Sequence, residues 1–267
     1  MIHQMNIYGK DKVENAIDRI RTFEPEEGYY LAFSGGKDSI VVKTLLDMAG
    51  AKYDAHYNIT SVDPPELVNF IKTFPDVQRD YPRDKEGNVI TMWKLIPKKT
   101  MPPTRIVRYC CAYLKEQSGI GRFVVTGVRK AESAKRAMRG GVEIADTKTG
   151  KRENIDPDNP SQETIHICHM KSQKILNPII DWEDDDVWEF IHEYNVPYCK
   201  LYDEGFKRLG CIGCPIGSHK IEELNRYPTY KRAYTRAFDK MLESRKDKGL
   251  ETVWTNGNQV MEWWLSQ

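Results

Sequence analysis

One six-residue segment, Ser34-Gly35-Gly36-Lys37-Asp38-Ser39, limits what this chain can fold into more than any other stretch. It follows an apolar run, Tyr29 to Phe33, and precedes a helix-like segment, Ile40 to Met48, that ends at Gly50. A strand, a tight glycine turn and a helix N-terminus direct free backbone N–H groups and the positive end of the helix dipole toward one point. The Lys37 ammonium and the two serine hydroxyls add side-chain donors. The segment therefore predicts a loop that holds a phosphate-like group.

The spacing of this loop separates it from better-known phosphate motifs. It lacks the G-x-x-x-x-G-K-S/T spacing of a Walker A loop, and its adjacent glycines exclude G-x-G-x-x-G. The alternative is an ordinary glycine turn. The segment resembles the pyrophosphate loop of the ATP pyrophosphatase superfamily, whose members cleave ATP to AMP and pyrophosphate. In this interpretation Lys37 neutralises the departing pyrophosphate and Asp38 helps to hold Mg²⁺, while the alternative for Asp38 is a first-turn acid that stabilises the helix dipole.

Strand-like and helix-like segments alternate along the chain, which predicts an α/β fold with a doubly wound, mostly parallel sheet. The resemblance implies the adenine nucleotide alpha hydrolase-like form of this fold. We predict strands over 53–59, 89–96 and 122–128, and helices over 11–23, after Asp63-Pro64 and after the acidic run 183–186. Ligands bind at the carboxyl ends of such strands, where Ser34-Gly35 and Gly127 to Arg129 fall. We expect one domain over residues 1–200 and a helical extension, 201–267, packed on it.

Length and charge leave most classes of partner open. With 267 residues the chain can bury a large core, and its net charge of +1 selects no partner. No apolar run approaches the roughly 18 residues of a membrane span, and the N-terminus lacks a signal-like apolar stretch. We therefore expect a cytoplasmic protein, in which the six cysteines are ligands or catalysts and not disulfides.

Four of the cysteines form two close pairs, Cys110-Cys111 and Cys211-x-x-Cys214. Four thiolates from two loops can hold an iron–sulfur cluster or a tetrahedral zinc ion, and the Gly and Pro residues around the second pair permit the necessary turn. Adjacent cysteines are unusual for zinc, so we rank a cluster first, zinc second and a redox dithiol third. Cys168 and Cys199 stand alone.

Further segments between about Tyr29 and Pro215 resemble the phosphoadenosine phosphosulfate (PAPS) reductase family, a branch of the ATP pyrophosphatases. They are Thr60–Glu66, Arg108–Lys115, Thr126–Ser133 and Asn177–Trp182. The two cysteine pairs are similar to the four ligands of the [4Fe–4S] cluster in adenosine phosphosulfate (APS) reductases. The resemblance implies that Lys115, one helical turn after Cys111, lies near both cluster and nucleotide. Leu114 stands where related reductases usually have an arginine.

Arg129 is a second candidate for phosphate binding. It follows a predicted strand and Gly127, so its forked donors could reach a nucleotide phosphate. Glu132 and Ser133 are candidates to contact the ribose or to orient Arg129. The alternative is a surface arginine at a helix start, with Glu132 paired to Lys135 or Arg136.

The expected reaction departs from that of the reductases. Sulfonucleotide reductases carry a nucleophilic cysteine in a C-terminal tail, whereas the last cysteine here is Cys214. They also tend to lose the full loop sequence that this chain keeps. The resemblance therefore implies binding of Mg·ATP, release of pyrophosphate and adenylation of an acceptor for sulfur transfer, as in DNA-phosphorothioation and tRNA-thiolation relatives. The predicted catalytic residues are Lys37, Asp38 and Arg129. The alternatives are an APS or PAPS reductase and a non-catalytic nucleotide- or nucleic-acid-binding protein.

The C-terminal third is helical and basic, with 11 Lys and Arg against 5 Asp and Glu over residues 207–248. Aromatic residues are interleaved with these cations, which is typical of nucleic-acid binding; they are Tyr227, Tyr230, Tyr234 and Phe238. Their spacing of three and four also predicts a core stripe, and a basic face is often simply solvated. Nucleic-acid binding by this third would imply a nucleic-acid acceptor, and sulfur transfer would imply a sulfur-donor protein such as a cysteine desulfurase.

Two remaining stretches carry weaker signals. The polar stretch 139–162 predicts a long loop or a hairpin over the site. The tract His166-Ile167-Cys168-His169 has ligand-type side chains, but we assign it no metal because such groupings also occur by chance on strands. The acidic run 183–186 predicts partners for a helix dipole rather than metal ligands.

Overall fold

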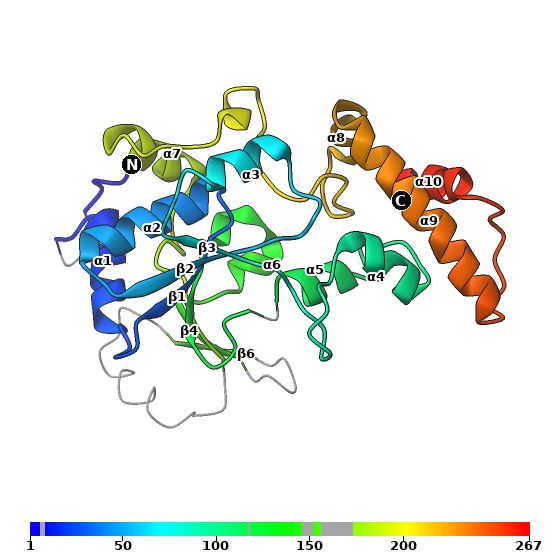
Figure 1. The fold of residues 1–267 in the computed structure, drawn as a ribbon. Coiled ribbons are helices and arrows are strands. Elements are labelled where there is room, and N and C mark those ends of the chain that lie inside the picture. The colour runs from blue at the N-terminus through cyan, green and yellow to red at the C-terminus, as the bar shows by residue number, and fades with distance from the viewer. Residues whose placement is uncertain (6–8, 117, 146–151, 156–172) are drawn as a thin grey trace. The chain divides into compact units, whose positions relative to one another are not determined.

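The strands form one seven-stranded sheet in the order β3-β2-β1-β4-β7-β5-β6, and Figure 1 draws the strands as arrows. The computed structural model describes residues 1–5, 9–116, 118–145, 152–155 and 173–267. The strands are β1 (Tyr29–Ala32), β2 (Tyr53–Asn58), β3 (Val77–Asp80), β4 (Phe123–Val125), β5 (Val142–Ala145), β6 (Arg152–Ile155) and β7 (Gln173–Leu176). β1 pairs in parallel with β2 and β4, and β4 pairs in parallel with β7, whereas β5 is antiparallel to β7 and β6. The predicted, mostly parallel α/β sheet is confirmed.

The register of the central strands explains where a site can form. Leu31 of β1 lies beside Val125 of β4, and both side chains are fully buried. Strands that are covered on both faces are expected to be continuously apolar, as β1 and β4 are. Because the two strands are parallel and in register, the loops that follow them, 33–36 and 126–129, leave the sheet at the same edge.

Helices α1 (Lys12–Thr22), α2 (Lys37–Ala49) and α7 (Asp184–Glu193) belong to the part of the chain that carries this edge. α2 contacts both α1 and α7. α1 begins at Asp11, which forms a capping box with Glu14, and α2 ends at Gly50 in the left-handed conformation. α7 begins at Glu183, which forms a capping box with Asp186. The predicted helix over 11–23, the end of α2 at Gly50 and the acidic start of α7 are therefore confirmed, whereas α2 begins at Lys37 and not at Ile40.

The chain divides into two compact units that interleave along the sequence. Unit 1 contains residues 1–57, 69–78 and 119–209, and unit 2 contains residues 58–68, 79–118 and 210–267. A single boundary at residue 200 is predicted from the sequence. In the structure, residues 58–68 and 79–118 belong to the same unit as the C-terminal helices.

Unit 2 is largely helical. Its helices are α4 (Met92–Lys99), α5 (Tyr109–Leu114), α8 (Lys220–Arg226), α9 (Pro228–Asp247) and α10 (Gly257–Leu265), while α3 (Pro65–Ile71) starts in its first segment. α9 contacts α4, α8 and α10. Tyr234 and Phe238 of α9 are buried against Trp264 of α10. The aromatic spacing of three and four therefore marks a core stripe, which is the alternative that the sequence analysis kept open.

The prediction of a strand over residues 89–96 is wrong, because α4 begins within it. The Thr91 hydroxyl accepts a hydrogen bond from the Lys94 N–H and caps the helix. Met92, Leu95 and Ile96 are buried at helical spacing. A short apolar run does not distinguish a strand from a buried helix, and here the cap and the core of unit 2 select the helix.

The remaining elements are short. They are α6 (Ala134–Ala137) and the 3-10 turns η1 (Lys130–Glu132) and η3 (Lys200–Tyr202). Within the predicted insertion, β5 and β6 form an antiparallel pair, as the hairpin alternative predicts. The rest of that insertion and the tract 166–169 lie outside the described residues. None of the helices in the described ranges has the length and apolar character that crossing a membrane requires.

Candidate functional site

The loop between β1 and α2 is shaped by its own hydroxyl groups. Gly35 has a φ of 72°, and Gly36 is the extended N-cap of α2. The Ser39 hydroxyl donates to the Gly36 carbonyl at 2.9 Å and accepts the Ser34 N–H at 3.2 Å. The two serine hydroxyls are also 3.2 Å apart. These bonds close the turn around the start of α2, and donation by either serine hydroxyl to a phosphate stays a prediction.

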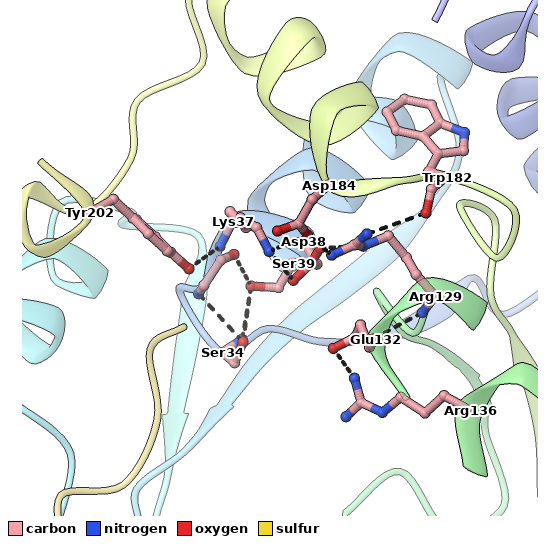
Figure 2. Close-up of polar contacts among 11 residues, drawn as sticks. Ser34, Lys37, Asp38, Ser39, Arg129, Glu132, Arg136, Trp182, Asp184 and Tyr202 are labelled. Carbon is pink, nitrogen blue, oxygen red and sulfur yellow. Dashed lines mark hydrogen bonds and ion pairs between the residues drawn. The ribbon is translucent and has the colours of Figure 1, made fainter. Parts of the chain in front are cut away.

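Two charged side chains of the first turn of α2, Lys37 and Asp38, lie beside two from other segments, Arg129 and Asp184 (Figure 2). Lys37 is only 5% exposed, and its Nζ lies 3.5 Å from Asp38 Oδ2 and 3.2 Å from Asp184 Oδ1. Arg129 Nε donates to Asp38 Oδ1 at 2.6 Å, and its NH2 donates to Asp184 Oδ1 at 2.5 Å. We call Lys37, Asp38, Arg129 and Asp184 the charge network.

Two members of the charge network, Asp184 and Arg129, have pKa values that are shifted toward the charged form. Burial opposes ionisation of Asp184, but its hydrogen bond to Arg129 and the charge of Lys37 lower its pKa. Burial likewise acts against the Arg129 charge, yet Asp38 and Asp184 raise its pKa above the ordinary value. Asp184 is therefore negative and Arg129 positive at neutral pH, and Lys37 Nζ lies beside Asp184 at the N-terminus of α2.

Arg129 does not present its fork outward as the sequence analysis expects. It is 1% exposed, and all three guanidinium nitrogens have partners: Asp38, Asp184 and, from NH1 at 3.2 Å, the Trp182 carbonyl. In this structure Arg129 positions the two carboxylates that flank Lys37. Contact with a nucleotide phosphate stays a prediction.

Gly127 and Glu132 support this arrangement from the strand side. A Cβ added at Gly127 would lie 2.9 Å from the backbone of Asp38, so the glycine lets β4 approach α2 closely. Glu132 accepts the Arg129 N–H at 3.0 Å and forms an ion pair with Arg136. The pairing with Arg136 was the alternative for Glu132. Ser133 caps α6 by accepting the Arg136 N–H at 3.3 Å.

Two residues of this site were missed by the sequence analysis. Asp184 belongs to an acidic run that we interpret as partners for a helix dipole, yet its carboxylate bridges Lys37 and Arg129. Tyr202 lies in η3, and its hydroxyl accepts the Lys37 backbone N–H at 2.9 Å. No local pattern marks either residue, because both reach the loop from more than 140 positions away in the sequence.

The four paired cysteines all belong to unit 2, and we call them the thiol group. Cys110 and Cys111 lie on α5. Cys211 and Cys214 flank a tight turn in which the Cys214 N–H donates to the Cys211 carbonyl at 3.1 Å and Gly213 has a φ of 70°. The Ile212 N–H donates to the Val62 carbonyl at 2.7 Å, which fixes this turn to the unit. Cys110, Cys111 and Cys211 pack in one hydrophobic cluster.

The sulfurs of the thiol group influence one another. A hydrogen bond between Cys110 and Cys111 raises the pKa of Cys110 and lowers the pKa of Cys111. Burial raises the pKa of Cys211 to about 12, and the charge of Lys115 acts in the opposite direction. The Cys211 sulfur in turn is the main cause of the raised pKa of Lys115. Lys115 therefore lies beside Cys211, and its proximity to a cluster and to a nucleotide stays a prediction.

Metal geometry is not preformed in the described part of the chain. There, no three His, Cys, Asp or Glu side chains stand close enough together to hold a metal ion. Of the two cysteines that stand alone in the sequence, Cys199 is 1% exposed in unit 1, and Cys168 lies outside the described residues.

Comparison with known proteins places the chain in a family. A family model described as the phosphoadenosine phosphosulfate reductase domain matches residues 28–216. The chain belongs to the phosphoadenosine phosphosulfate reductase family. The match spans the loop, Arg129, Asp184, Tyr202 and both cysteine pairs, so every residue of the site described above lies within the family domain. α9 and α10 lie beyond it.

Relatives of known sequence include members with and without an assigned activity. An uncharacterized protein of Methanocaldococcus jannaschii is 30% identical over 244 residues, which are 85% of this chain and 43% of that protein. The adenosine 5'-phosphosulfate reductase of Pseudomonas aeruginosa is 27% identical over 210 residues, which are 74% of this chain and 71% of the reductase. The chain spans about half the length of the two Methanocaldococcus proteins that it matches first, 48% and 43%.

Solved structures give looser matches. A phosphoadenylyl-sulfate reductase from Candida auris superimposes with a TM-score of 0.47 and 15% identity, over 74% of this chain and 88% of that chain. A U34-tRNA thiolase from Methanococcus maripaludis, solved with its [4Fe-4S] cluster, superimposes with a TM-score of 0.46 and 14% identity, over 93% of this chain and 86% of that chain.

Proposed function

We propose that this protein binds Mg·ATP at the loop after β1, cleaves it to AMP and pyrophosphate, and transfers the AMP group to an acceptor that then receives sulfur. The observation that carries this proposal is the full loop of residues 34–39, with Lys37 buried at the start of α2 between Asp38 and Asp184. A polyphosphate at this turn would meet backbone N–H groups, hydroxyls and an ammonium within one helical turn.

In the proposed reaction an oxygen of the acceptor attacks the α-phosphorus of ATP. The bond from this phosphorus to the oxygen that bridges the β-phosphorus breaks, and pyrophosphate leaves with the bonding electrons. Lys37 and the N-terminus of α2 stabilise the charge that grows on this leaving group. Arg129 and Asp184 hold Lys37 and Asp38 in place. The terminal sulfur of a persulfide on a donor such as a cysteine desulfurase then attacks the activated carbon of the acceptor, and AMP leaves with the electrons of the carbon–oxygen bond. A thiol reductant cleaves the sulfur–sulfur bond that still joins donor and acceptor.

The thiol group is proposed to hold a [4Fe–4S] cluster, with zinc as the second choice. Its donor chemistry fits, because four cysteines of one unit are arranged as two pairs and three of them share one hydrophobic cluster. When bound, a cluster would supply a centre for sulfur or electron transfer. Anaerobic purification is expected to give a brown protein with iron and acid-labile sulfide in equal amounts. A colourless protein that carries zinc would contradict this assignment.

A nucleic acid is the proposed acceptor, and the exposed basic side chains of α9 support this proposal. Arg232, Arg236 and Lys240 are exposed at successive four-residue steps and form no ion pair with any residue that the structure describes. Unit 2 carries 18 Lys and Arg against 13 Asp and Glu, whereas unit 1 carries 22 against 26. The near-zero charge of the whole chain therefore conceals a basic unit, and a row of exposed cations matches a phosphate backbone.

Salt dependence tests this surface. Replacing Arg232, Arg236 and Lys240 by Ala is expected to weaken nucleic-acid binding and to reduce the slope of log K against log salt by about 2 to 3, since each lost phosphate contact removes about 0.7 to 0.9. A control with Lys10, Lys52 and Lys72 of unit 1 replaced removes the same charge. Equal slopes for the two triple variants would contradict the assignment of α9.

The products of the reaction separate the proposed function from its alternative. We expect AMP and pyrophosphate from ATP when an acceptor nucleic acid and a sulfur source are supplied without oxygen. The relation to APS reductases favours one other candidate, release of sulfite from APS or PAPS with a thiol as reductant. Sulfite formation without AMP from ATP would establish that alternative. Tight ATP binding with neither product would indicate a non-catalytic protein.

A further inference from the structure

Tyr202 reaches the loop from a distant part of the chain and contacts the amide that begins α2. Its hydroxyl accepts the Lys37 N–H at 2.9 Å (Figure 2). This N–H belongs to the first residue of α2, so it has no acceptor within the helix. The hydroxyl also lies against the glycine turn, because a Cβ added at Gly36 would be 3.5 Å from it. Tyr202 therefore sits where a bound phosphate would meet the loop.

The hydroxyl of Tyr202 still has its hydrogen-bond donor available. A phenolic O–H group donates one hydrogen bond in addition to accepting others. Within the part of the chain that the structure describes, Lys37 N–H is the group that it accepts from, and no residue accepts its proton. Burial raises the pKa of Tyr202, so the proton is retained at any physiological pH. The group is thus a neutral donor beside two serines and a lysine.

The ring of Tyr202 is held by packing rather than by the loop alone. Trp188 of α7 contacts it edge-on with 5.2 Å between ring centroids. The Tyr202 N–H donates to the Cys199 carbonyl at 3.1 Å, and the neighbouring Leu201 is fully buried. Tyr198 contacts the same Trp188 ring, but its hydroxyl bonds Asp203 at 2.9 Å instead of the loop. Tyr198 is therefore a matched control in the same aromatic group.

We propose that Tyr202 is a phosphate-binding residue of the loop, which donates its O–H to a phosphate oxygen of the nucleotide while its oxygen keeps the Lys37 N–H. This inference rests on the proposed function, since it adds a donor to the same site. The tyrosine would extend the loop's donors with one that carries no charge. It would also couple phosphate binding to the packing of α7 and η3 through Trp188.

Calorimetric titration with inorganic pyrophosphate and with Mg·ATP tests the proposal on the full chain. Tyr202→Phe removes the O–H and keeps the ring, and it is expected to weaken pyrophosphate binding about 10-fold or more, as for a hydrogen bond to a charged acceptor. Tyr198→Phe is expected to bind as the parent protein does. Thermal unfolding of both variants shows whether the packing around Trp188 is retained.

The outcomes separate this inference from the proposed function. One outcome would overturn this inference alone: the parent protein binds pyrophosphate, Lys37→Ala weakens that binding, and Tyr202→Phe leaves it unchanged. Tyr202 would then only accept the Lys37 N–H. Tighter binding by Tyr202→Phe would overturn it in the same way and show that the hydroxyl competes with phosphate. If the parent protein binds neither ligand, the proposed function and this inference fall together.

Discussion

The charge network of unit 1 and the thiol group of unit 2 are built in opposite ways. In the network every charged side chain holds another, with separations from 2.5 to 3.5 Å. In the thiol group the sulfurs pack among apolar side chains, and the bond from Cys211 to Thr60 is 3.7 Å long. The chain itself fixes the geometry of the loop, whereas the described part of the chain has no preformed metal geometry at the thiols.

The largest expected effect concerns the thiol group. Cys111→Ser or Cys214→Ser is expected to lose most of the iron from anaerobically purified protein, because a cluster needs all four thiolates. Cys199→Ser, which removes a buried thiol of unit 1, is expected to keep it. Iron and sulfide analysis with the visible spectrum provides the measurement. Equal iron loss in all three variants would contradict the assignment of the paired cysteines as the cluster ligands.

The second effect concerns the charge network. Lys37→Ala is expected to lower the rate of AMP formation by about 100- to 1000-fold, as for removal of one preorganised donor to a growing negative charge. Lys43→Ala is the control, since Lys43 lies on the same helix but pairs with Asp47 and Asp76. AMP formation that survives in Lys37→Ala and fails in Lys43→Ala would contradict the assignment of the loop.

A smaller effect is expected from packing beneath the network. Gly127→Ala places a Cβ 2.9 Å from the backbone of Asp38, and we expect it to destabilise the protein by about 1–3 kcal/mol, as overpacking does. Gly210→Ala is the control, because an added Cβ there has nothing within 4 Å. Chemical denaturation compares the two variants. Equal stabilities would show that β4 and α2 have room to separate.

The smallest effect is a dependence of stability on acid. The pKa of Asp184 is lowered in the folded protein, so its contribution to stability is present above the unfolded value of about 3.9 and is lost as the pH falls through the folded value. Asp184→Asn is expected to make the unfolding midpoint fall less steeply below about pH 4. A parallel acid dependence in parent and variant would show that the ion pairs of Asp184 do not contribute.

The sequence alone predicts those parts of the two sites whose residues are close together along the chain. The loop, α2 and its end at Gly50 were predictable because a strand, a glycine turn and a cap are local in sequence. The cysteine pairs were recognisable for the same reason. Asp184 and Tyr202 were not, because their contacts with Lys37 arise only when α7 and η3 fold against the loop. In the sequence, Asp184 has the pattern of an ordinary helix start, and Tyr202 has that of an ordinary core aromatic residue.

The predictions that differ from the structure do so for specific physical reasons. Residues 89–96 were predicted as a strand because a short apolar run carries no decisive period, and Thr91 as a cap was overlooked. Arg129 was expected to face a ligand, but partners on two other elements bury its guanidinium. The interleaving of the two units was not predictable either, since it depends on which segments pack with the C-terminal helices.

Calorimetric titration of the protein with Mg·ATP tests the central claim most directly, because that claim is that the turn after β1 grips the phosphates of an adenine nucleotide. We predict one site per chain, with an affinity that falls at least about 10-fold in Lys37→Ala, since a lost charge-assisted contact is worth about 1.5–3 kcal/mol. Unchanged affinity in Lys37→Ala, or no binding by the parent protein, would contradict the account.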